Sequence, residues 1–236
     1  MSVLVLVRHG ESVCNSKNIF TGWLDSELTE EGINEAYDAG MLLKNNGFTF
    51  DVGYTSFLSR ASDTLNYILN ELELNIPVYK SWMLNERCYG ILEGMNKDDA
   101  RNIYGSVQVQ RWRRGLTDFP PPMSINDKNH PCNCEKYRGI DPMLLPSSEN
   151  LHSVMLRVVN YFESEIKNKI IDNKSVIVVA HQNSLRALIS YLEKLNEEDT
   201  LRLELPNAIP IAYELDSNLN ILNKQVIDKN FGVKRR

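Results

Sequence analysis

Short apolar runs alternate along the chain with longer segments whose apolar residues recur at helical spacing. The runs of strand length lie at 3–7, 52–55, 176–180 and 211–215. The segments of helical period lie at 30–43, 61–72, 151–166 and 185–192. Strands that alternate with helices indicate βαβ units and a largely parallel sheet. We predict an α/β fold in which Thr29 and Ser148 cap helices and 211–215 is the last strand.

The composition is that of an ordinary globular protein, with 42% apolar and 24% charged residues among 236. We predict one domain over 1–236. The net charge of −5 argues against affinity for nucleic acid or an anionic membrane, so an anionic ligand needs a local cluster of cations. Apolar runs fall far short of the roughly 20 residues that span a bilayer. The start has no secretory signal and four cysteines make no disulfide framework, which favours a cytoplasmic protein with reduced thiols.

One segment interrupts the alternation of strands and helices. Residues 119–141 contain prolines at 120, 121, 122 and 131 and few periodic apolar residues. A loop this long inside a domain is usually functional. We expect an irregular cover over a binding site here.

Polar residues follow the predicted strands. Burying a polar side chain at such a position is costly unless it binds a partner or a ligand. They are Arg8, His9 and Asn15 after the first strand, Arg60 after the second, Glu86 and Arg87 in the middle of the chain, and His181 and Asn183 after 176–180. In a parallel sheet these positions share the carboxyl edge, where open α/β sheets bind ligands. We therefore expect two histidines, a carboxylate and several arginines to converge.

This set of side chains suits phosphoryl transfer. A neutral imidazole such as that of His9 can accept a phosphoryl group covalently. Arg8, Arg60 and a protonated His181 would match the negative charge of the transferring group. Glu86 is the carboxylate placed to move the proton of the entering or leaving hydroxyl. None of these roles requires a metal.

Nine short segments of the chain carry a specific resemblance. They are 8–12 (RHGES), 20–23 (FTGW), 54–56 (YTS), 84–87 (LNER), 89–90 (YG), 94–97 (GMNK), 112–114 (WRR), 180–181 (AH) and 183–186 (NSLR). With these segments the chain resembles, from about 3 to 216, the cofactor-dependent phosphoglycerate mutases of the histidine phosphatase superfamily. The resemblance implies a three-layer α/β/α sandwich on a mainly parallel sheet, a homodimer or homotetramer, and 2,3-bisphosphoglycerate as the primer.

The resemblance also implies the roles of individual residues. His9 is phosphorylated, Glu86 is the general acid/base, and His181 stabilises the transferring phosphoryl group. The residues implied to bind that group or the rest of a phosphoglycerate are Arg8, Ser12, Asn15, Thr21, Gly22, Arg60, Arg87, Cys88, Tyr89, Lys97, Arg113, Arg114, Gln182 and Asn183. The implied activity interconverts 3-phosphoglycerate and 2-phosphoglycerate.

The chain departs from the family pattern at four places. Cys88 stands where the family usually has histidine, which predicts weaker substrate binding. Gln182 replaces a glycine, which predicts strain if the backbone φ is positive there. Asn207–Ala208 replaces Thr–Gly with local consequences only. The chain ends at Arg236, short of the family's covering tail, which predicts faster loss of the phosphoryl group to water.

Two other functions stay open at this point. A phosphatase on the same framework is favoured by Gln182 and the short tail, and a non-catalytic binding protein is favoured by Cys88. His130, Cys132, Cys134 and Glu135 match no zinc-site spacing, so we expect no metal there. Cys14 and Cys88 are interpreted as packed thiols.

Overall fold

The first strand, β1 (Ser2–Arg8), lies inside a six-stranded sheet, because its Leu-Val run is apolar on both faces. The computed structural model describes residues 2–229, so the basic residues 234–236 of the expected short tail lie outside the described part. The strand order is β3-β2-β4-β1-β5-β6. The other strands are β2 (Val52–Thr55), β3 (Val78–Lys80), β4 (Val176–Ala180), β5 (Ile211–Leu215) and β6 (Ile221–Val226). β3, β2, β4 and β1 are parallel, whereas β5 is antiparallel to both of its neighbours.

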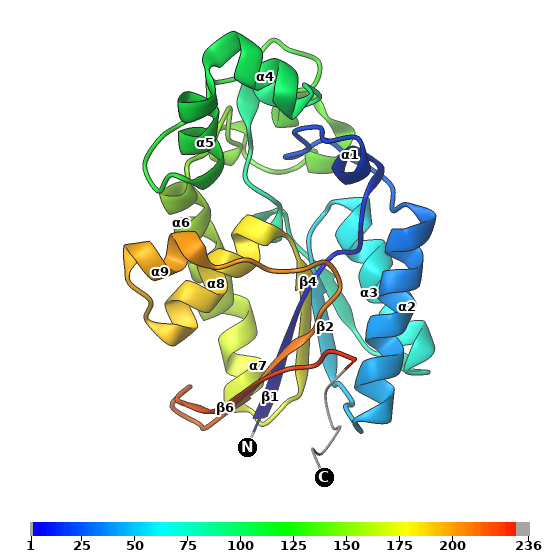
Figure 1. The fold of residues 1–236 in the computed structure, drawn as a ribbon. Coiled ribbons are helices and arrows are strands. Elements are labelled where there is room, and N and C mark those ends of the chain that lie inside the picture. Colours follow the sequence, from blue (N-terminus) through cyan, green and yellow to red (C-terminus); the bar gives the residue numbers. More distant parts are fainter. Residues whose placement is uncertain (1, 230–236) are drawn as a thin grey trace.

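Helices cover both faces of this sheet, which confirms the predicted three-layer α/β/α sandwich (Figure 1). One face carries α2 (Glu30–Asn45) and α3 (Ser59–Glu71). The other face carries α6 (Leu151–Tyr161), α7 (Lys167–Ile171) and α8 (Gln182–Glu193), with a π-helical turn at Phe162–Ile166. Four shorter helices complete the fold: α1 (Val13–Ser16), α4 (Lys97–Tyr104), α5 (Ser106–Arg114) and α9 (Glu197–Arg202).

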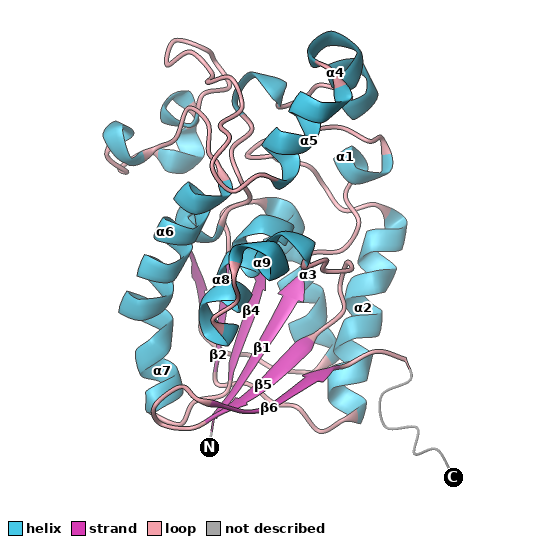
Figure 2. Ribbon diagram, turned by 60° about the vertical axis from the view of Figure 1, so that its left-hand side comes forward, coloured by secondary structure: helices cyan, strands magenta, loops and turns pink. Residues whose placement is uncertain are grey.

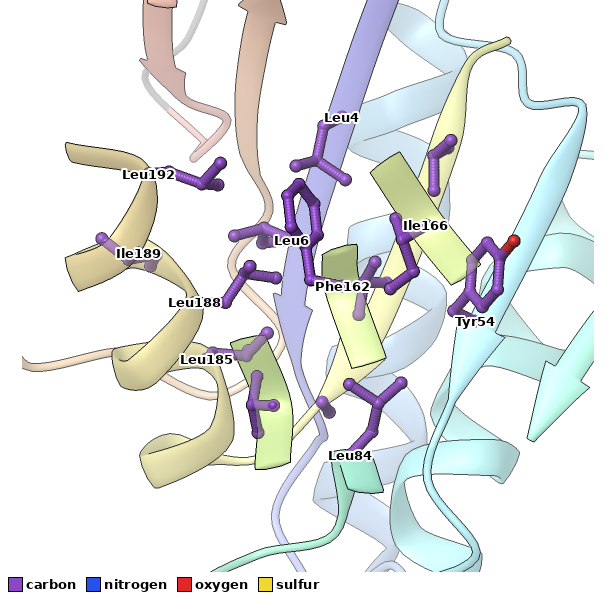
Figure 3. Packing of buried hydrophobic residues seen from close by; sticks show 14 of the residues in the cluster. Leu4, Leu6, Tyr54, Leu84, Phe162, Ile166, Leu185, Leu188, Ile189 and Leu192 are labelled. Atoms are coloured by element: carbon purple, nitrogen blue, oxygen red, sulfur yellow. The ribbon is translucent and has the colours of Figure 1, made fainter. Parts of the chain in front are cut away.

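Alternating residues of the central strands divide the core into two layers. Leu4 and Leu6 pack with Phe162 and α8, as Figure 3 shows. Val5 and Val7 face the opposite layer, against α2 and α3. Both faces of β1 therefore bury apolar side chains, and each Å² of apolar area removed from water contributes about 25 cal/mol. Because β3, β2, β4 and β1 are parallel, their carboxyl ends lie at one edge of the sheet, below α4 and α5 (Figure 2).

Two boundaries of the predicted elements are wrong. Thr29 caps α2 as predicted, accepting a hydrogen bond from Gly32 N. The cap of α6 is Asn150, because its side chain accepts from Ser153 N at 2.8 Å, and Ser148 lies two residues too early. The strand at 211–215 is β5 but not the last one, since the chain turns back into β6.

Residues 119–141 are irregular, with short 3₁₀ turns at Pro131–Asn133 and Glu135–Tyr137. Tyr137 is buried and stacks on Trp23, with ring centroids 5.1 Å apart. Its hydroxyl accepts a hydrogen bond from Asn85 Nδ2 at 2.9 Å. The segment thus supports Asn85 through Tyr137, and the expected cover is not confirmed, because none of its residues lines the cavity described below. Within residues 2–229 we find no helix both long and apolar enough to span a bilayer.

Candidate active site

The ends of β1 and β4 bring two histidines together. Arg8 pairs with Ala180 across the parallel ladder, and His9 N donates to Ala180 O at 3.0 Å. His181 follows Ala180 directly, so the two imidazoles lie side by side with ring centroids 5.0 Å apart. The predicted convergence of these histidines is confirmed.

His9 is held in one orientation. Its Nδ1 lies 2.7 Å from Gly10 O, a partner that only accepts, so Nδ1 carries the proton and Nε2 keeps a lone pair. Burial, and after it the charges of Arg60 and Arg8, lower the pKa of His9 well below 6.5. The imidazole is therefore neutral at pH 7, as a nucleophile requires.

His181 is fully buried beside His9. Its Nε2 lies 2.7 Å from Ser56 Oγ, and its Nδ1 has no hydrogen-bond partner among the described residues. Burial, followed by the charges of Arg60 and His9, lowers the pKa of His181 well below its usual value. The positive charges of Arg60 and Arg8 disfavour a further charge on the imidazole of His181, so the proton proposed for it needs the negative charge of a phosphoryl group beside it.

Glu86 lies opposite the histidines, after a 3₁₀ turn at Trp82–Leu84. Its Oε1 accepts from Asn183 Nδ2 at 2.7 Å and from Arg87 N at 2.7 Å. Asn183 belongs to the first turn of α8, whose free N–H groups favour negative charge. The carboxylate is thus fixed against α8 while it still lines the pocket.

A cavity of about 270 Å³ is lined by His9 and Glu86, whereas the fully buried His181 lies beside His9 and is not among the lining residues. Thirteen of the predicted site residues line the cavity: Arg8, His9, Asn15, Thr21, Gly22, Arg60, Glu86, Tyr89, Lys97, Arg113, Arg114, Gln182 and Asn183. Sequence reasoning assigned no role to four further lining residues: Ile19, Phe20, Arg186 and Glu204. Arg186 was foreseeable, because it lies one helical turn after Asn183 and donates to Asn183 Oδ1 at 2.8 Å.

Three predicted binding residues, Ser12, Arg87 and Cys88, do not line the cavity. Ser12 caps α1 and accepts from Asn15 N, which orients Asn15. Arg87 is fully buried and donates to Trp112 O at 2.6 Å, which anchors the end of α5. These two residues support lining residues instead of lining the cavity themselves.

The expectation that Cys88 faces the substrate is wrong. Its thiol is buried in a hydrophobic cluster with Trp23, Tyr137 and Leu145. Burial raises the pKa of this thiol well above its usual value, so it stays protonated. The backbone turns between Glu86 and Cys88, so that only the former side chain reaches the cavity.

The expected strain at Gln182 is also absent. Gln182 is the first residue of α8, and positive φ occurs instead at Ala208, with a φ of 47°. Ala208 N donates to Arg8 O at 2.9 Å, which ties this strained position to the end of β1. Gln182 Nε2 donates to Leu203 O at 3.3 Å, whereas its Oε1 is buried with no partner among the described residues.

A buried ion pair that the sequence did not reveal supports Glu86. Arg157 donates from Nε to Glu149 Oε1 at 2.7 Å. Its other nitrogens donate to Asn85 O and Glu86 O, each at 2.9 Å. Arg157 follows Val154 by three residues on the buried face of α6. This helical spacing is the feature of the sequence from which a buried Arg157 could have been predicted.

The segment 130–135 is held by local hydrogen bonds. His130 Nδ1 lies 2.9 Å from Cys132 Sγ, and its Nε2 lies 3.0 Å from Ser147 Oγ. In the part of the chain from 2 to 229, no three His, Cys, Asp or Glu side chains gather closely enough to hold a metal ion.

Comparison with known proteins identifies the class. A family model of the histidine phosphatase superfamily (branch 1) matches residues 4–130 and 125–225. The chain therefore belongs to the histidine phosphatase superfamily. Two solved structures share the fold: an α-ribazole phosphatase from Shigella flexneri (TM-score 0.68, 21% identity, 95% of both chains) and a phosphoglycerate mutase from Bacillus anthracis (TM-score 0.65, 24% identity, 95% of this chain and 91% of that one).

Two curated relatives share about half of the residues of this chain and carry the same name. The chain is 48% identical over 221 residues to a 2,3-bisphosphoglycerate-dependent phosphoglycerate mutase from Hamiltonella defensa, covering 93% of this chain and 89% of the relative. It is 47% identical over 238 aligned positions to the protein of that name from Borreliella burgdorferi strain B31, covering 100% of this chain and 95% of the relative. The predicted resemblance to the cofactor-dependent phosphoglycerate mutases is confirmed.

Proposed function

We infer that this protein is a 2,3-bisphosphoglycerate-dependent phosphoglycerate mutase that interconverts 3-phosphoglycerate and 2-phosphoglycerate through a phosphohistidine at His9. The observation that carries this conclusion is His9, oriented by its Nδ1 contact with Gly10 O, lining the same cavity as Glu86, Arg8 and Arg60. Relatives at 48% and 47% identity support it by their names.

The chemistry divides into two transfers between the substrate and His9. In the first, Glu86 takes the proton of the free hydroxyl of 3-phosphoglycerate, whose oxygen forms a bond to the phosphorus carried by the primed His9 while the bond from that phosphorus to His9 Nε2 breaks. In the second, His9 Nε2 forms a bond to the phosphorus of the original 3-phosphate, the bond from that phosphorus to its ester oxygen breaks, and Glu86 returns the proton to that oxygen, which leaves 2-phosphoglycerate and restores the phosphohistidine. Arg8, Arg60 and the N-terminus of α8 face the charge on the three phosphoryl oxygens.

The pocket fits a ligand with two phosphates and a carboxylate. Six cationic side chains line it, namely Arg8, Arg60, Lys97, Arg113, Arg114 and Arg186, against the two carboxylates Glu86 and Glu204. Burial and the neighbouring Arg113 and Arg8 lower the pKa of Lys97 to about 8. This crowding of positive charge is relieved when an anion binds. When bound, 2,3-bisphosphoglycerate supplies the phosphoryl group that primes His9.

The residues that would grip the carboxylate and second phosphate of the substrate include six that line the cavity: Thr21, Gly22, Tyr89, Lys97, Arg113 and Arg114. Since side chains fill every role, we expect activity to survive chelation of metals by EDTA. We further propose a cytoplasmic location and assembly as a homodimer or homotetramer, which gel filtration with light scattering tests.

The deciding assay measures 2-phosphoglycerate formation and phosphate release from 3-phosphoglycerate, with and without 2,3-bisphosphoglycerate. A mutase isomerises far faster than it releases phosphate and is stimulated by the primer. Phosphate release that exceeds isomerisation would instead identify a phosphatase. Tight ligand binding without either activity would identify a non-catalytic homologue.

A further inference from the structure

Glu204 places a negative charge inside an otherwise cationic pocket. It lies after α9, on the segment that passes the end of β1, where Leu205 O accepts a hydrogen bond from Arg8 Nη1 at 2.8 Å. Its Oε1 lies 2.7 Å from Arg114 Nη1, at the end of α5. The pair therefore joins two elements across the cavity that both side chains line.

Glu204 differs from the other carboxylate of the pocket. Glu86 is nearly buried and is fixed by donors from Asn183 and Arg87. The side chain of Glu204 is 64% exposed and that of Arg114 is 30% exposed, so their ion pair faces solvent. An exposed ion pair is weak, so another anion can replace Glu204 as the partner of Arg114. An arriving anion competes with Glu204 for Arg114.

We propose that Glu204 is a specificity-determining residue that weakens binding of the most highly charged ligand of the pocket, 2,3-bisphosphoglycerate, relative to monophosphoglycerates. This inference rests on the proposed function. Glu204 competes for Arg114 and also repels every anion in the cavity. Because Coulomb repulsion scales with the ligand's charge, the bisphosphate is disfavoured more than a monophosphoglycerate.

The contribution of Glu204 is modest because it is exposed and screened. Removing its charge is expected to tighten the binding of 2,3-bisphosphoglycerate by about three- to fivefold and that of 3-phosphoglycerate by about twofold. Glu198 on α9 is the matched control, since it pairs with Arg202 and is also exposed, but does not line the cavity. Neither substitution removes a buried contact.

The experiment is calorimetric titration of a His9→Ala protein, in which no phosphoryl transfer to His9 disturbs the equilibrium. Inorganic phosphate, 3-phosphoglycerate and 2,3-bisphosphoglycerate are titrated into this protein and into versions that also carry Glu204→Gln or Glu198→Gln. Glu204→Gln is expected to increase the affinity for 2,3-bisphosphoglycerate more than the affinities for the other two ligands. This increase in affinity is expected to be smaller at about 200 mM salt than at about 20 mM salt. Glu198→Gln is expected to change nothing.

A double-mutant cycle with Arg114→Met tests the competition itself, since the gain from Glu204→Gln should be smaller without Arg114. If Glu204→Gln tightens no ligand beyond Glu198→Gln, or tightens all three equally, the inference is overturned while the proposed function stands. If the His9→Ala protein binds none of the three ligands, the proposed function fails and this inference fails with it.

Discussion

Arg157 donates a hydrogen bond to the backbone oxygen of Glu86 at 2.9 Å while it forms a buried ion pair with Glu149. Glu149 in turn accepts from Cys88 N at 2.9 Å. One ion pair thus holds the backbone on both sides of the proposed general acid/base. Its donors and acceptors are satisfied, which is the condition under which a buried pair is tolerated.

Replacing Arg157 by alanine is expected to lower the free energy of unfolding by about 3–5 kcal/mol, because Glu149 is left as an uncompensated buried charge. Urea unfolding measures this. Arg138 is the control, since it pairs with Glu135 on the surface and its alanine variant should lose less than about 1 kcal/mol. Equal losses in the two variants would contradict the role assigned to Arg157.

Gly22→Ala is expected to raise the KM for 3-phosphoglycerate. Gly22 has a φ of +50°, and an added Cβ would lie 2.0 Å from Glu93 Oε1. That oxygen accepts from Trp23 N and Tyr89 N, so moving it disturbs two segments of the cavity wall. Gly47→Ala is the control, with a φ of +74° and open space around it. It should lose about 1–2 kcal/mol of stability and keep its KM; a similar KM change in both variants would contradict the steric argument.

Cys88→His is expected to destabilise the protein by about 1–3 kcal/mol and to leave ligand affinity no tighter, because the larger ring overpacks a closed cluster. Thermal unfolding and phosphoglycerate titration measure the two effects. The exposed Cys134 provides the control, since Cys134→His should be tolerated. A tighter affinity in Cys88→His would restore the view that this position faces the substrate.

Stability should fall as the pH drops below 6.5. Burial holds the pKa of His9, His130 and His181 below the unfolded value, so the unfolded chain binds more protons there. The stability that these neutral histidines contribute is fully present above pH 6.5. As the pH falls below 6.5, each histidine lowers the free energy of unfolding by up to about 1.4 kcal/mol per pH unit. His9→Gln removes one of these contributions. Urea unfolding between pH 5 and 8 should show a shallower slope for this variant, and an unchanged slope would argue against a neutral His9.

The elements that position the site could be predicted because their sequence signals are strong. β2, β4 and β5 have the predicted bounds, since β4 is an uninterrupted apolar run and the other two are short, mostly apolar runs between polar segments. β3 was missed because it has three residues, two of them exposed. β6 was missed because Asn223 and Lys224 interrupt its apolar pattern at the sheet edge.

Side-chain direction was predictable only within regular structure. His9 and His181 follow strands whose ladder fixes their direction, and they meet as predicted. Arg87 and Cys88 lie in an irregular segment with no fixed period, so nothing in the sequence shows that they turn away from the cavity. Glu204 was missed because its link to Arg114 joins positions 90 residues apart.

The most direct measurement is to incubate the protein with 2,3-bisphosphoglycerate labelled in its phosphate groups and to locate the label by mass spectrometry under alkaline conditions. The account predicts one acid-labile phosphoryl group on His9 and none in the His9→Ala variant. Label that persists in His9→Ala, or that resides on His181 in the native protein, would contradict it.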